Sequence, residues 1–226
     1  MAKRILHWCI LSAALIIIGG GAQAQVLSLN AVGVLSVALQ ADEPQLVAIQ
    51  LIPVEASGAT FTIPEVFGTN NLVPGTLVGV YDAVSEDYCL EEFSAGSWTP
   101  GTCTVQRGQS VWVKAPSNSV LKLSGYVPGS GESNTMMQVV SGMQLFGCPY
   151  PVGAAYTNGF MGAGAPGDVV IPLAGDGTVS TNATAVAYYS GTGWFPADGR
   201  FGLASGWWYK SYSNRTWTVT KPYVYP

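Results

Sequence analysis

Gly96-Ser97-Trp98-Thr99-Pro100 is followed, 96 residues further along the chain, by Thr192-Gly193-Trp194-Phe195-Pro196. At the same spacing, Val111-Trp112-Val113-Lys114 has a counterpart in Trp207-Trp208-Tyr209-Lys210. Tryptophan, proline and lysine recur in register without a gap, which is hard to attribute to chance. The sequence therefore predicts an internal repeat, with two copies of one structural unit in tandem.

Each copy is predicted to be rich in β-strands. Valine, threonine and aromatic residues favour strands, and the pairs Ser117-Asn118 and Ser213-Asn214 favour turns between them. No segment after residue 24 sustains a helical period. The expected fold class is all-β, with two tandem homologous units that are each a β-sandwich or a small barrel. Residues 41–128 form the first unit, residues 129–137 a linker and residues 138–226 the second unit.

The second unit is rich in aromatic side chains, which suggests a binding or assembly surface. Alternate side chains of a strand share a face, so Trp207 and Tyr209 lie opposite Trp208. With Trp208 expected to anchor the core, Trp207 and Tyr209 are expected to point outward, and Trp194 and Tyr212 complete the candidate surface. Planar rings on such a surface stack on sugars or hold another protein. The alternative, in which both faces are buried between packed units, stays open.

The first 24 residues have the pattern of an export signal. Lys3 and Arg4 precede a mostly apolar run, and a cleavage site of small residues ends at Ala24. The apolar run is shorter than the roughly 20 residues that a membrane-spanning helix needs. We therefore expect residues 1–24 to be a signal peptide that is cleaved. The exported chain is then no integral membrane protein and lies outside the cell or on its surface, with the periplasm left open.

Loss of this signal narrows the chemistry that the exported chain can perform. His7 is the only histidine, so catalysis and metal binding through imidazole are excluded. Without Lys3 and Arg4, 7 basic residues remain against 13 acidic ones, which argues against nucleic acid as a partner. The sequence contains no phosphate-binding loop and no hydrolase elbow. We expect no enzymatic activity, no catalytic residue, no cofactor and no metal.

Residues 25–40 precede the first unit as an extra segment with no expected counterpart before the second unit. Residues 26–39 are apolar, β-prone and uncharged, so they form an aggregation-prone strand unless they are paired. In one interpretation, this strand completes a sheet within its own chain. In the other, it adds to the sheet of a neighbouring subunit and builds a filament or lattice. The residues that would form this inter-subunit strand are Val26, Leu29, Val32, Val34 and Val37.

Two cysteines and most of the acidic residues lie in the first unit, and Cys148 lies in the second. Cys89 and Cys103 are expected to form a disulfide, because export leads to an oxidising compartment. Cys148 is either a small buried hydrophobic residue or a thiol that joins two chains. A solvated acidic loop, in an insertion expected only in the first unit, is predicted from Asp82, Glu86, Asp87, Glu91 and Glu92.

Three features together carry a resemblance: Asn-Ala-Val-Gly at residues 30–33, the segment at residues 144–151, and the paired Trp…Trp-x-Lys hairpins. In these features the chain resembles a group of secreted β-repeat proteins of environmental bacteria that have no established activity. The resemblance implies export and duplication and implies no ligand. We expect a non-enzymatic secreted or cell-surface structural protein that self-assembles. The alternative is an extracellular module that binds carbohydrate, or a surface, through the aromatic cluster.

Overall fold

The computed structural model describes residues 31–56, 58–70, 72–129, 131–155, 164–172, 187–195 and 200–224. These residues confirm the all-β fold class, since they form antiparallel strands and a single short helix. No helix in these ranges is long and apolar enough to cross a membrane. The proposed signal at residues 1–24 and two residues of the expected inter-subunit strand, Val26 and Leu29, lie outside the described residues.

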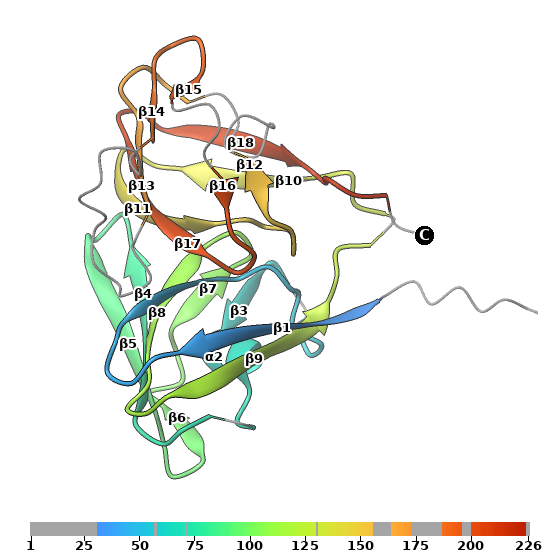
Figure 1. Cartoon of the computed structure of the whole chain (residues 1–226), viewed down its shortest axis with the longest axis vertical. Helices are drawn as coiled ribbons and strands as arrows, with labels where there is room; N and C mark the ends of the chain where they lie inside the picture. Colours follow the sequence, from blue (N-terminus) through green and yellow to red (C-terminus); the bar gives the residue numbers. More distant parts are fainter. Residues whose placement is uncertain are drawn as a thin grey trace, which may run out of the picture.

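In Figure 1, the described residues between 31 and 129, the first half, form the lower lobe, and those between 131 and 224, the second half, form the upper lobe. The first half contains β1 (Val32–Leu39), β2 (Gln45–Ala48), β3 (Thr60–Thr62), α2 (Ile63–Phe67), β4 (Thr76–Asp82), β5 (Asp87–Ser94), β6 (Ser97–Thr99), β7 (Thr104–Gln106), β8 (Ser110–Lys114) and β9 (Ser119–Tyr126). The second half contains β10 (Asn134–Val139), β11 (Gly142–Gly147), β12 (Ala154–Ala155), β13 (Val169–Pro172), β14 (Ala187–Tyr189), β15 (Trp194–Phe195), β16 (Arg200–Phe201), β17 (Gly206–Ser211) and β18 (Arg215–Thr220).

The strand orders of the two halves match strand for strand. The first half has a sheet of order β2-β8-β4-β5-β6 and the strand pairs β1-β9 and β3-β7. The second half has a sheet of order β11-β17-β13-β14-β15 and the pairs β10-β18 and β12-β16. In both, the first strand pairs with the last and the second with the last but one, so that the chain folds back on itself in nested antiparallel pairs.

Two of the repeated sequence features have the same structural role in both halves. The side-chain oxygen of Asn118 accepts a hydrogen bond from the Ala41 backbone N–H at 2.8 Å, and that of Asn214 accepts one from Ser141 at 2.7 Å. These bonds attach the turn before the last strand to the backbone that leads into β2 or β11. The repeated tryptophans are both buried: Trp98 packs against Phe93, and Trp194 against Tyr189.

The expectation that Trp208 anchors the core of the second half is wrong. In β8, the valines on either side of Trp112 are fully buried, whereas Trp112 is half-buried. In β17, Trp207 and Tyr209 face the core, and Trp208 packs edge-on against Tyr81 of the first half, with ring centroids 5.0 Å apart. Trp207 and Tyr209 do share one face of the strand, as strand alternation predicted, but the packing of the neighbouring layers decides which face is buried.

Three boundaries also differ from expectation. β10 pairs with β18 as β1 pairs with β9, so residues 32–39 of the front segment do have a counterpart and residues 134–137 are strand rather than linker. β1 itself pairs with β9 of its own chain, as the intramolecular interpretation predicted.

The longer hairpin connection lies in the second half, because Val170 pairs with Ala187 whereas Val78 pairs with Glu91. The insertion assigned to the first unit was therefore placed in the wrong half.

The two halves meet edge to edge through backbone hydrogen bonds. The Ala48 N–H donates to the Ala204 carbonyl at 2.9 Å, and the Gly147 N–H donates to the Gly108 carbonyl at 2.8 Å. Ala48 and Gly147 occupy matching places in β2 and β11, opposite the first residues of β8 and β17. The two hydrogen bonds are therefore reciprocal: each half donates one to the other from the same position of its structure, as in an isologous dimer interface.

Glycine makes this approach possible at two positions. A Cβ atom on Gly147 would lie well inside contact distance of the Ala48 Cβ, and one on Gly206 would overlap the Ser110 side chain. The Ser110 hydroxyl lies at the same joint and donates to the Phe146 carbonyl at 2.5 Å. The interface therefore requires residues without side chains where the two backbones come closest.

We predict that Gly147→Ala lowers the free energy of unfolding by at least about 2 kcal/mol, because the new methyl group meets the Ala48 side chain and backbone. Urea unfolding followed by tryptophan fluorescence measures the effect. Gly193→Ala is the matched control, since a Cβ there meets no atom within 4 Å. Equal stability of the two variants would contradict the close approach.

Candidate functional site

Three of the four residues of the expected aromatic surface belong to the core of the second half. Trp194, Trp207 and Tyr209 are 6%, 1% and 0% exposed, whereas Tyr212 is 58% exposed. The expectation of an outward pair at Trp207 and Tyr209 is therefore wrong, and the alternative of burial holds for both. Of the expected surface, only Tyr212 is available to a partner.

Tyr209 is buried because the core supplies partners for its hydroxyl. Its hydroxyl donates to the Asp168 carboxylate at 2.5 Å and accepts from the Arg215 guanidinium at 2.5 Å. Arg215 also forms an ion pair with the fully buried Asp168. Burial raises the pKa of Tyr209, which keeps the hydroxyl protonated. The sequence analysis missed this network, because Asp168 and Arg215 are far from each other in the chain and form no motif.

The exposed rings of the second half lie on two other strands. Tyr188 on β14 and Phe195 on β15 are 46% and 59% exposed and pair in register, with ring centroids 5.6 Å apart. Phe195 directly follows the buried Trp194, as strand alternation requires. Neither residue of this pair belongs to the candidate surface predicted from the sequence.

Cys89 and Cys103 form the expected disulfide, which joins β5 to the segment just before β7. Cys148 is completely buried and has no disulfide partner among the described residues. Burial raises the pKa of its thiol to about 12, so the reactive thiolate is not populated at neutral pH. These features agree with the interpretation of Cys148 as a small hydrophobic residue.

Glu91 departs from the expected solvated acidic loop. Its side chain points inward from β5 and is 1% exposed. One carboxyl oxygen accepts a hydrogen bond from the Cys103 N–H at 2.5 Å, and the other has no hydrogen-bond partner among the described residues. Burial raises the pKa of Glu91, although the bonds from the Cys103 and Thr102 N–H groups oppose this shift. Glu91 therefore holds the backbone beside the disulfide rather than facing solvent.

β1 places an uncharged strand at the edge of its sheet. In the part of the chain that the structure describes, β1 pairs only with β9, so its other edge has no ladder partner. On the outer face, Val32 and Val34 are 62% and 61% exposed, whereas Leu35 and Leu39 pack into the core. In the matching strand β10, Asn134 replaces Val34 at the position opposite the last strand. Val37 is partly buried against the first core.

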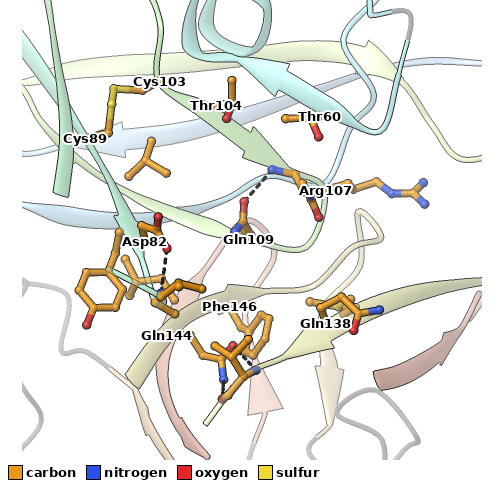
Figure 2. Close-up of a pocket in the computed structure, with 18 of the residues that line it drawn as sticks. Thr60, Asp82, Cys89, Cys103, Thr104, Arg107, Gln109, Gln138, Gln144 and Phe146 are labelled. Atoms are coloured by element: carbon orange, nitrogen blue, oxygen red, sulfur yellow. Dashed lines mark hydrogen bonds between the residues drawn. A yellow bond between two sulfur atoms is a disulfide. The ribbon is translucent and has the colours of Figure 1, made fainter. Parts of the chain in front are cut away.

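A pocket of about 450 Å³ lies between the two halves. In Figure 2, Thr60, Thr104 and Gln109 of the first half lie on one side, and Gln138 and Gln144 of the second half lie on the other. The end of β4 and the start of the turn after it, residues 81–84, form a third wall, and the Cys89–Cys103 disulfide lies beside it. Apart from Asp82 and Arg107, the side chains that line this pocket are neutral, some polar and some apolar. The sequence analysis could not detect it, because its walls come from both halves.

We predict that Glu91 makes stability depend on pH. A carboxyl group whose pKa is higher in the folded than in the unfolded state stabilises the fold while it is protonated. For Glu91, this stabilisation is complete below the ordinary pKa of 4.5 and is lost as the pH rises through the raised pKa. Glu91→Gln keeps an acceptor for the Cys103 N–H and carries no charge. Its free energy of unfolding relative to the parent protein should therefore increase from pH 4 to pH 7, measured by urea titration. The same difference at both pH values would contradict a raised pKa.

Within the described residues, no three histidine, cysteine, aspartate or glutamate side chains converge on one point. Comparisons with family models, with curated proteins and with solved structures find no match for this chain. The resemblance to secreted repeat proteins and the absence of enzymatic activity stay predictions. The two features that the structure offers for function are the edge of β1 and the pocket between the halves.

Proposed function

We propose that this chain is an exported, non-enzymatic structural protein that associates with copies of itself through the outer edge of β1. The observation that carries this proposal is an eight-residue uncharged strand with one edge free of ladder partners among the described strands. Proteins usually protect such an edge with lysine, proline or a bulge, and the residues of β1 include none of these. The proposal places the protein outside the cell or on its surface, with the periplasm as the remaining alternative.

The same edge on a second copy is the partner that fits best. Two β1 strands that pair antiparallel across a two-fold axis use the same residues on both sides, which gives a continuous sheet of order β9-β1-β1-β9. The exposed side chains of Val32 and Val34 then meet apolar side chains of the partner instead of water. Such a contact closes a dimer. A filament or lattice needs a second contact, for which the exposed pair of Tyr188 and Phe195 is the candidate.

We further propose that the two halves are tandem copies of one unit, each containing its own front strand. The matching strand orders, the reciprocal contacts of Ala48 and Gly147, and the equivalent bonds of Asn118 and Asn214 support this. Export is supported by the disulfide between Cys89 and Cys103, because such bonds persist in oxidising compartments. The alternative function, a binding module built on the aromatic cluster, loses support because most of its named rings are buried.

We predict that Val34→Lys, in the chain without residues 1–24, abolishes self-association and leaves the fold intact. The substitution adds a charge beside the open edge, and two such charges face each other across the proposed interface. Analytical ultracentrifugation measures the assembly state, and thermal unfolding checks the fold. The matched control is Asn134→Lys, at the equivalent position of β10, which should assemble like the parent protein.

Electron microscopy of the parent protein distinguishes a closed dimer from a filament or lattice. A parent protein that stays monomeric at every concentration would disprove the proposal. So would a Val34→Lys variant that assembles like the parent.

A further inference from the structure

We infer that the pocket between the halves binds a neutral carbohydrate. This inference is independent of the edge of β1, because no residue of β1 lines the pocket. The volume, about 450 Å³, falls within the roughly 300–1,000 Å³ of small-ligand sites.

The two charged side chains of the pocket, Arg107 and Asp82, have hydrogen-bond partners within the chain, although Nη1 of Arg107 is buried without a partner among the described residues. Arg107 forms an ion pair with Glu132 at 2.6 Å and donates to the Thr135 hydroxyl at 2.8 Å. Asp82 accepts a hydrogen bond from the Val84 backbone N–H at 2.8 Å, which lowers the pKa of this carboxyl and stabilises the local turn. The lining therefore offers a charged ligand one group of each sign, whereas its neutral polar side chains are more numerous.

The free polar groups of the pocket are amides and hydroxyls. The Gln109 side chain accepts from the Gln106 N–H through its oxygen, and Gln138 accepts from Thr216 through its oxygen, so each leaves its NH₂ group available. The hydroxyls of Thr60 and Thr104 make no hydrogen bond to another described side chain or backbone group and stand on the exposed face of β3 and β7. Gln144 is different, because both of its polar atoms bond to the Val140 backbone.

This set of groups matches the hydroxyls of a sugar. A sugar hydroxyl donates and accepts at once, so it is satisfied by amide and threonine side chains without any charge. The pocket also offers apolar surface for the C–H face of a sugar ring, from the half-buried Tyr81 and the 71% exposed Met136. The amides of Gln109 and Gln138 come from different halves, so an occupied pocket bridges the two halves and stabilises their joint.

The experiment is calorimetric titration of the chain without residues 1–24 with four neutral hexasaccharides: cellohexaose, maltohexaose, xylohexaose and laminarihexaose. Hexagalacturonate is the charged comparison, and a Gly-Ser hexapeptide is the neutral peptide comparison. We expect one neutral hexasaccharide to bind and raise the melting temperature, and neither comparison to bind. Binding of the peptide or of hexagalacturonate in preference to every neutral sugar overturns the inference, as does the absence of any binding up to millimolar concentration.

Variants locate the binding site. Thr104→Val and Gln138→Leu each remove one polar partner and should each weaken binding about five-fold, the effect of one lost hydrogen bond. Thr218→Val, on the exposed face of β18 outside the pocket, is the matched control and should bind like the parent. Sugar binding that both pocket variants retain in full would place the ligand elsewhere and overturn the inference. The Val34→Lys variant should bind sugar like the parent protein, which separates this result from the outcome for self-association.

Discussion

The two halves approach so closely at Gly147 and Gly206 that a Cβ atom on either glycine would overlap the Ala48 or Ser110 side chain of the other half. This constraint fixes the relative position of the five-stranded sheets, because β2 of one half and β11 of the other bond to the partner at matching places. The packing of Trp208 on Tyr81 and the pocket between the halves both follow from that arrangement. A joint made of backbone groups also tolerates change in the surrounding side chains, since hydrogen bonds between peptide groups do not depend on residue type.

The two halves use the same strand order with different core chemistry. Val113 in β8 is a simple apolar residue, whereas Tyr209 at the matching place in β17 requires Asp168 and Arg215 to satisfy its hydroxyl. The disulfide belongs to the first half alone among the described residues. These differences suggest that each half stabilises the shared topology with its own set of interactions. A buried polar network is costly unless every partner is present, so the second half depends more strongly on its individual side chains.

The all-β class and the matching strands β8 and β17 could be predicted from the sequence, because tryptophan, lysine and asparagine recur at constant spacing. The expected hairpins do not form, since β8 pairs with β2 and β4 and β9 pairs with β1, and β17 and β18 likewise pair with other strands. The burial of Trp207 and Tyr209 could not be predicted from the sequence. Strand alternation places the two side chains on one face of the strand, but tertiary packing decides whether that face is buried. The strand β10 was missed for a different reason. Its polar residues, such as Asn134 and Gln138, conceal the likeness to the apolar β1. The pocket and the Glu91 contact depend on segments that meet only in the folded chain.

The nesting of the strands has a mechanical consequence. Val32 lies opposite Tyr126 where the chain enters and leaves the first half, and Asn134 lies opposite Thr220 in the second. Tension applied along the chain therefore pulls apart the outermost rung of each ladder first and opens the others one after another, instead of shearing them together. Under traction at a cell surface, β1-β9 and β10-β18 would peel before the five-stranded sheets bear force, so the molecule would lengthen gradually while its two cores stay closed.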